Sequence, residues 1–220
     1  NSHMVDGIIY IAGHARKINC FPENFGTPAV MAYAYDQNPM VPAVLPDDET
    51  SAYQMTRYLI RKGHKKIALL AGREDNLHTR RRLKGYQNAL FDAQILYNPR
   101  LVRYVDWNKP SGYQETKRLL KEDITAIFCM SDMIAGGVYQ YLDEQGLRAG
   151  RDVSVVGFDN HVLSEYMIPG LTTMALPLKE IGTTSAKLLF DQIEKGEVEM
   201  NREILIPCFF VERCSVKEIK

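Results

Sequence analysis

Short apolar runs alternate with amphipathic stretches along almost the whole sequence. The runs are rich in Val, Ile and Ala, and most are continuous, which is typical of strands that are buried on both faces of a parallel sheet. They predict seven strands, at residues 5–12, 29–35, 66–71, 101–105, 125–130, 153–158 and 204–211.

The stretches between these runs have helical periodicity. In the first of them, apolar residues recur at i, i+3, i+7 and i+8 from Ala52, in a segment that starts near Asp47 or Asp48 and stops at Gly63. The same reasoning predicts helices at 79–92, 111–121, 131–146 and 178–195. Since strand and helix alternate throughout, the sequence predicts stacked βαβ units and an α/β fold.

The charge balance limits the classes of partner. The 220 residues include 27 Lys and Arg and 27 Asp and Glu, so the formal net charge is zero. Proteins that coat nucleic acid or anionic membranes use a surplus of basic residues to displace counterions, so we expect any DNA contact to lie in another segment. A chain of this length is also at the size where one core begins to divide into two lobes.

Targeting and catalytic motifs are missing from the sequence. No apolar run approaches the roughly 20 residues of a membrane span, and the start lacks a secretory signal, so we expect a cytoplasmic protein. Residues 1–4 read as a cloning scar that leads directly into a strand, which predicts an excised fragment. The four cysteines form no C-x-x-C pair, and motifs for hydrolases, nucleotides and metals are absent. We therefore expect no enzyme, cofactor or metal.

Several polar residues follow the predicted strands, where a parallel sheet places its ligands. Asp159 comes directly after the run 153–158, and Ser131 and Asp132 follow the run 125–130. Taken alone, each of these residues favours a helix cap or an Asx turn over a contact with a ligand, because Ser and Asp are common in both local structures. Trp107 lies in a polar turn after the run 101–105, where it can belong to the core or to the rim of a pocket, and its ring face suits a sugar.

Segments in this order and spacing resemble the effector-binding domain of the LacI/GalR family of bacterial transcription regulators. The resemblance extends from Val5 to Ser215. The segments that carry it are Val5-Asp6-Gly7-Ile8-Ile9, Gly63-His64-Lys65-Lys66-Ile67-Ala68, Arg82-Leu83-Lys84-Gly85-Tyr86, Thr125-Ala126-Ile127-Phe128 with Ser131-Asp132, Asp152-Val153-Ser154-Val155-Val156-Gly157-Phe158-Asp159-Asn160, and Pro169-Gly170-Leu171-Thr172-Thr173.

The resemblance implies a periplasmic-binding-protein-like fold of type I, in which two α/β lobes hold a ligand between them. Residues 5–63 and 176–203 would form an incomplete N-terminal lobe, and residues 64–175 and 204–220 the C-terminal lobe. The family's helix-turn-helix, its hinge and the first two strand-helix units would lie outside this sequence. The family also implies a homodimer whose helix-turn-helix contacts operator DNA.

The resemblance also implies roles for five residues. Arg82 corresponds to an arginine that donates to sugar hydroxyls or a carboxylate, and Asp159 to the acceptor that faces it. Trp107 corresponds to the aromatic residue that stacks on the ligand. Ser131 stands where many sugar-responsive members have Asn, and His78 stands at another contact position.

These implications favour a ligand-gated repressor that binds a small carbohydrate and changes its affinity for operator DNA. The alternative is an extracytoplasmic sugar-binding receptor of a transport or sensing system with the same fold.

Overall fold

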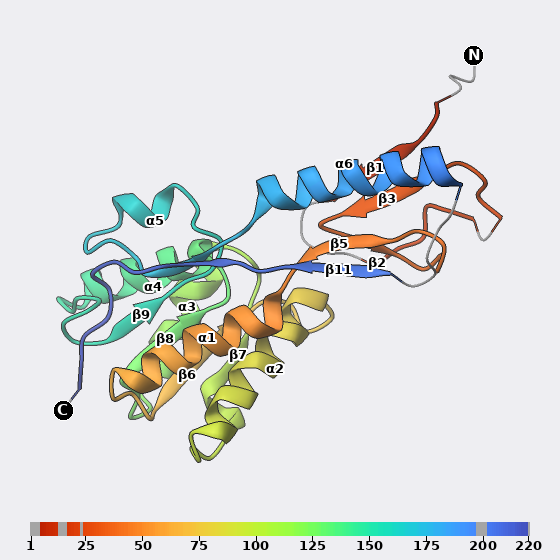
Figure 1. The fold of residues 1–220 in the computed structure, drawn as a ribbon. Helices are drawn as coiled ribbons and strands as arrows, with labels where there is room; N and C mark the ends of the chain where they lie inside the picture. The colour runs from red at the N-terminus through yellow and green to blue at the C-terminus, as the bar shows by residue number, and fades with distance from the viewer. Residues whose placement is uncertain (1–4, 13–16, 23, 197–201, 220) are drawn as a thin grey trace. The chain divides into compact units, whose positions relative to one another are not determined.

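The chain divides into two compact units in the computed structural model, which describes residues 5–12, 17–22, 24–196 and 202–219. The first unit consists of residues 1–47 and 177–207, and the second of residues 48–176 and 208–220 (Figure 1). The predicted cloning scar, residues 1–4, lies outside the described residues.

The first unit is built on a parallel four-stranded sheet in the order β1-β3-β5-β11. Its strands are β1 (Ile8–Ile11), β3 (Ala29–Ala32), β5 (Ala43–Pro46) and β11 (Glu203–Ile206). Helix α6 (Leu178–Lys195) packs on this sheet, where Ile181 and Leu188 contact Val30 and Val44. A short parallel pair, β2 (Lys17–Ile18) with β4 (Tyr35–Asp36), completes the described part of this unit.

The second unit is a helix-sheet-helix sandwich around a parallel sheet in the order β7-β6-β8-β9. Its strands are β6 (Ile67–Ala71), β7 (Val102–Tyr104), β8 (Ala126–Cys129) and β9 (Ser154–Val156). Its longer helices are α1 (Asp48–Arg61), α2 (Leu77–Asp92), α3 (Lys109–Leu119) and α4 (Asp132–Glu144).

Alternation along β6 explains why both faces of this sheet are covered. Ile67 and Leu69 point into the core that contains apolar residues of α1 and α2, whereas Ala68 and Leu70 point into the core that contains those of α3 and α4. Successive side chains of a strand point to opposite faces, so a continuous apolar run supplies two cores at once.

The remaining elements of the second unit are short. A 3₁₀ turn (Pro99–Leu101) precedes β7, and helix α5 (Leu163–Tyr166) follows β9. Strands β10 (Thr173–Ala175) and β12 (Phe209–Val211) form an antiparallel pair.

The structure differs from the predicted elements in several places. The run 29–35 contains strand β3 and the first residue of β4, and the short elements β2, β10 and α5 were not predicted. Strand β5 was not predicted, because Pro42 and Pro46 bound its apolar residues and proline disfavours the interior of a strand. The predicted strand 204–211 is two strands, because Pro207 interrupts the run: β11 pairs with β5 and β12 pairs with β10.

The boundary between the units also differs from the prediction. Residues 5–63 were expected in the first lobe, but helix α1 belongs to the second unit, because its apolar face packs with α2 against the second sheet. The chain therefore enters the second unit at Asp48 and not at His64. Residues 204–207 were expected in the C-terminal lobe and belong to the first unit, because β11 extends the first sheet. Leu176 was expected in the N-terminal lobe and belongs to the second unit.

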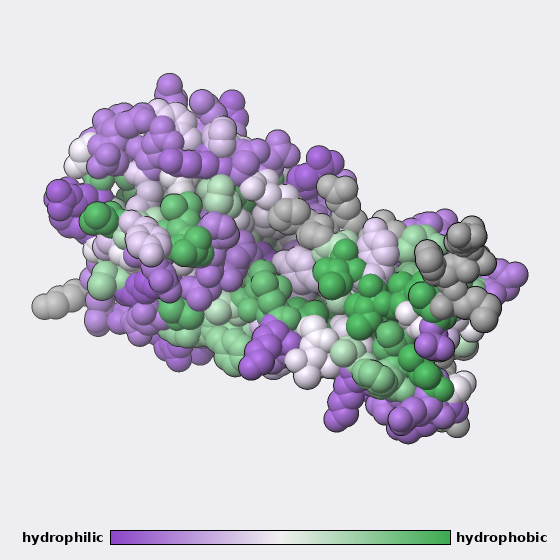
Figure 2. Space-filling model, turned by 90° about the horizontal axis from the view of Figure 1, so that it is seen from above, coloured by the Kyte–Doolittle hydropathy of each residue, from purple (hydrophilic) through white to green (hydrophobic). Residues whose placement is uncertain are grey.

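The first unit exposes apolar side chains. Figure 2 shows hydrophobic residues at its surface. Ile11 on the edge strand β1 is 74 % exposed, and Phe190 on α6 is 67 % exposed. Among the helices that the structure describes, none is long and apolar enough to cross a membrane.

Candidate functional site

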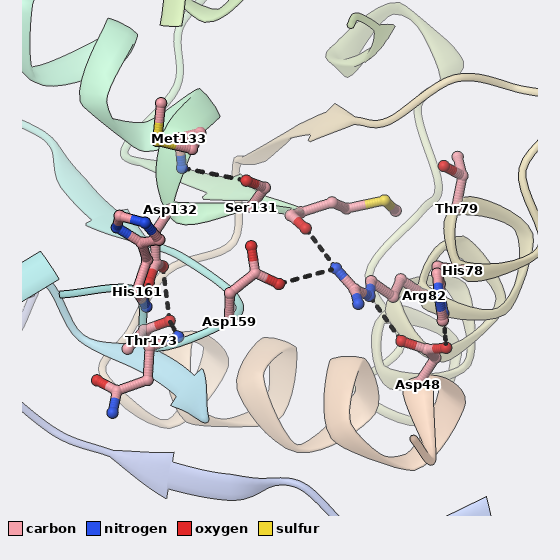
Figure 3. Close-up of polar contacts among 12 residues, drawn as sticks. Asp48, His78, Thr79, Arg82, Ser131, Asp132, Met133, Asp159, His161 and Thr173 are labelled. Carbon is pink, nitrogen blue, oxygen red and sulfur yellow. Dashed lines mark hydrogen bonds and ion pairs between the residues drawn. The ribbon is translucent and has the colours of Figure 1, made fainter. Parts of the chain in front are cut away.

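Polar and charged side chains gather in the second unit where β8 and β9 end and helices α1 and α2 begin (Figure 3). Arg82, on the second turn of α2, is the centre of this cluster and is only 1 % exposed. A buried guanidinium must be paired and hydrogen-bonded, because water no longer solvates its charge.

Arg82 is held from three directions. Its Nε donates to Oδ1 of Asp48 at 2.7 Å, and its Nη1 donates to the carbonyl of Met130. Its guanidinium carbon lies 3.6 Å from the centre of the Phe158 ring and 5.9 Å from that of Trp107. A planar guanidinium stacks well on aromatic faces, so the group is fixed before any ligand arrives.

Asp48 joins Arg82 to His78. Nδ1 of His78 lies 2.5 Å from Oδ2 of Asp48, and both side chains are buried. Burial alone would raise the pKa of Asp48, but the charges and hydrogen bonds of Arg82 and His78 outweigh it and hold the pKa below its usual value. Since an ionised carboxylate can only accept, Nδ1 of His78 is the donor in this contact.

Asp159 approaches Arg82 from the end of β9. Its Oδ1 is 3.9 Å from Nη1 of Arg82, and its side chain keeps 28 % exposure. Burial raises the pKa of Asp159 to about 6, although Arg82 and a hydrogen bond from Ser131 act in the opposite direction. Asp159 is thus an acceptor that can still reach a ligand.

Ser131 and Trp107 complete the cluster. The Ser131 hydroxyl caps α4 by accepting from the backbone N–H of Met133 at 3.1 Å. Trp107 is half-buried and packs against both cores of the second unit. A Cβ on Gly72 would lie 1.9 Å from the indole ring, so the glycine makes room for the tryptophan.

The structure therefore brings together all five residues that the sequence analysis singled out. Arg82, Asp159, Ser131 and Trp107 are neighbours, and His78 joins them through Asp48. Their contact with a ligand stays a prediction.

Sequence reasoning missed two important members of the cluster. The sequence pattern gives Asp48 only as a possible start of a helix, and Phe158 only as part of a buried strand. The signal for Asp48 was an acidic residue in the first turn of a helix, which is common at surface helices as well.

A separate hollow of about 830 Å³ lies beside the loop after β6 and α3. Its lining includes Glu74, Asp75, Tyr104, Asp106 and Glu115 and none of the five predicted residues. Within the part of the chain that the structure describes, no group of three or more His, Cys, Asp or Glu residues could hold a metal ion.

Two α/β units with parallel sheets, and a buried arginine among carboxylates at the strand ends, define a binding protein rather than a structural module. A family model described as a periplasmic binding protein-like domain matches residues 56–216.

Curated proteins with similar sequences are transcriptional repressors. The HTH-type transcriptional repressor CytR of Escherichia coli K12 is 34 % identical over 194 residues, which are 87 % of this chain and 57 % of that protein. The ribose operon repressor of Haemophilus influenzae is 31 % identical over 218 residues, which are 98 % of this chain and 65 % of that protein. The chain thus spans less than two thirds of these relatives.

Solved structures agree. A LacI family transcriptional regulator from Enterococcus faecium with bound ribose superimposes with a TM-score of 0.80 at 34 % identity, covering 90 % of this chain and 74 % of that one. A complex of the transcriptional regulator CelR with cellobiose gives a TM-score of 0.81 at 28 % identity, covering 96 % and 66 %. The chain belongs to the LacI family of transcriptional regulators, which confirms the predicted family and fold class.

Proposed function

We propose that this chain is the ligand-sensing part of a LacI-type repressor and that its effector is a small uncharged carbohydrate. The observation that carries the proposal is the buried Arg82, with Asp159 facing it and Trp107 beside it. The ribose and cellobiose bound to two structural neighbours support the same class of ligand.

The charges of the cluster favour an uncharged ligand. The positive charge of Arg82 is already matched by Asp48 at 2.7 Å, and Asp159 adds a second carboxylate at 3.9 Å. An anionic ligand would therefore meet the Asp159 carboxylate, while the charge of Arg82 is already paired with Asp48. A sugar hydroxyl can accept from Arg82 and donate to Asp159, while the apolar C–H face of the sugar packs on Trp107.

Ser131 and His78 take different parts in this proposal. The Ser131 hydroxyl lies next to Asp159 and would contact a ligand hydroxyl directly. His78 is 2 % exposed and bound to Asp48, so its burial favours an indirect role in which it holds the carboxylate that orients Arg82.

The proposed assembly is a cytoplasmic homodimer that reaches operator DNA through a helix-turn-helix in another part of the protein. The regulators among the relatives support this arrangement and support neither an enzyme nor an extracytoplasmic receptor. A reading frame with a helix-turn-helix upstream of Val5 supports the repressor, whereas a signal peptide there favours the receptor.

A thermal-shift screen of the full-length protein tests the ligand class. Three sets of compounds are compared at pH 7.5: neutral pentoses, hexoses and disaccharides; phosphorylated sugars; and purine bases and nucleosides. A neutral sugar at about 100 times its Kd should stabilise the folded protein by about 2.7 kcal/mol. Stabilisation by nucleobases or phosphosugars and by no neutral sugar would show the carbohydrate proposal to be wrong.

A further inference from the structure

Asp132 is a buried carboxylate near Asp159, and the proposed function gives it no role. Asp132 is the first residue of α4 and is fully buried. Its Oδ1 accepts from the hydroxyl of Thr173 at 2.7 Å, and its Oδ2 accepts from the backbone N–H of His161 at 2.7 Å (Figure 3). Both oxygens are therefore occupied by groups outside its own helix.

Capping does not account for Asp132. The side chain that caps α4 is Ser131, which accepts from Met133. An acidic residue in the first turn of a helix is usually solvated there and stabilises the helix only slightly. The fold instead makes room for this carboxylate, since a Cβ on Gly157 would lie 2.1 Å from Oδ1 of Asp132.

The segment that Asp132 holds has an unusual backbone. Asp159 has φ of 114° and Asn160 has φ of 54°, values that residues with side chains rarely adopt. Each such residue costs about 1–3 kcal/mol and persists only where its surroundings fix it. The direction of the Asp159 carboxylate depends on this turn.

Asp132 binds the chain on both sides of the turn. Its own N–H donates to the carbonyl of Phe158, just before the turn, and its carboxylate accepts from His161, just after it. Thr173, its other partner, also accepts from the backbone N–H of Asn160 at 3.4 Å.

We propose that Asp132 is a positioning residue for the effector: by bracketing the left-handed turn at Asp159 and Asn160, it aims the Asp159 carboxylate at Arg82 and at the ligand. This inference rests on the proposed function, because it gives Asp159 the role of a ligand acceptor. It gives Asp132, Thr173 and Gly157 a role in orienting the ligand site, in addition to the residues that would touch the ligand.

Asp132 changes its protonation state near neutral pH. Burial raises the pKa of Asp132 to about 7, and the charge of Asp159 raises it too, while the Thr173 and His161 hydrogen bonds and Arg213 act in the opposite direction. The other titratable groups near it are Cys129 and Tyr139. A protonated Asp132 can still accept from the His161 N–H and can donate to the Thr173 hydroxyl, so both contacts on the turn are possible in either protonation state.

Two variants separate the charge of Asp132 from its hydrogen bonds. Asp132→Asn keeps an oxygen that accepts from His161 and offers an amide that donates to the Thr173 hydroxyl, but it cannot ionise. Asp132→Ala removes both bonds. Thr116→Val is the matched control, because Thr116 is equally buried in the same unit and its hydroxyl donates to Gly112, away from the turn.

The first measurement needs no ligand. Amide hydrogen exchange at His161 should be at least tenfold faster in Asp132→Ala than in Thr116→Val at matched stability, and Asp132→Asn should retain most of the protection. Unchanged protection of His161 in Asp132→Ala would overturn the proposal.

The second measurement is affinity for a neutral sugar, with ribose as the first probe, followed from pH 5.5 to 8.5. Asp132→Ala should bind about 10–100 times more weakly at pH 8. Asp132→Asn should bind within a few-fold of wild type across this pH range, because its amide can make both contacts. Thr116→Val should follow wild type.

The outcomes distinguish this proposal from the proposed function. Binding of no neutral sugar by the wild-type protein would count against the carbohydrate proposal, and the exchange at His161 would then decide the role of Asp132 alone. Sugar binding by wild type with equal affinity in Asp132→Ala would overturn the positioning role and leave the carbohydrate proposal in place.

Discussion

Removal of the Asp48 carboxylate is the most informative single change in the cluster. Asp48→Ala leaves the Arg82 guanidinium 1 % exposed with the Met130 carbonyl, the Phe158 ring and a carboxylate of Asp159 at 3.9 Å. Two charges about 4 Å apart interact by about 4 kcal/mol at an effective dielectric constant of 20. Removal of one partner from a buried ion pair lowers the free energy of unfolding by about 3–5 kcal/mol, which agrees with this Coulomb energy.

Urea unfolding followed by tryptophan fluorescence measures this loss of stability. The signal reports on the second structural unit, because the single tryptophan of the chain, Trp107, lies there. With an m-value of about 2–3 kcal/mol/M, the midpoint should fall by about 1–2 M in Asp48→Ala. Asp48→Asn keeps an acceptor for Arg82 and should lose about 1–3 kcal/mol.

Glu49→Ala is the matched control. Glu49 is the next carboxylate on α1 and pairs with Lys84 at 3.0 Å on the surface, where an ion pair contributes less than about 1 kcal/mol. If Asp48→Ala lowers the free energy of unfolding no more than Glu49→Ala does, the view that Asp48 neutralises a buried arginine is refuted.

Three further predictions concern the site. Arg82→Ala should weaken sugar binding by about 2–4 kcal/mol in isothermal titration, and an unchanged affinity would remove Arg82 from the site. Gly72→Ala should displace Trp107 and shift its emission maximum, whereas an unaltered spectrum would contradict the close packing of the two residues. Because burial raises the pKa of Asp132 to about 7, the folded state binds the extra proton between about pH 4 and 7, so stability should fall by up to about 4 kcal/mol as the pH rises through this range. Asp132→Asn should flatten that part of the pH profile measured by urea unfolding, and an identical profile would contradict the assignment.

The sequence predicts the second unit better than the first. Strands β6 and β8 are continuous apolar runs, and each is followed by a predicted helix. The apolar run 153–158 ends at the polar Asp159. The positions of β6, β8 and β9 are confirmed. Helix 178–195 is also confirmed. Strand β5 was not predicted because it is bounded by prolines. A strand tolerates proline at its ends, but the sequence pattern does not distinguish the ends of a strand from its interior.

The partners of the site residues were harder to predict than the residues themselves. Asp48 lies 30 and 34 residues from His78 and Arg82, and only the packing of α1 on α2 brings the three together. The sequence shows Asp132 as a polar residue after a predicted strand. The turn at Asp159 depends on positive φ values, and the presence of Asp and Asn in the sequence does not predict them. Sequence pattern therefore finds candidates, while long-range contacts decide what each one does.

A crystal structure of the full-length protein with its neutral sugar tests the central claim most directly. The account predicts a sugar hydroxyl within about 3.2 Å of both the Arg82 guanidinium and the Asp159 carboxylate, with the Trp107 ring against the C–H face of the sugar. A sugar bound elsewhere, with Arg82 still engaged only by Asp48 and Met130, would contradict it.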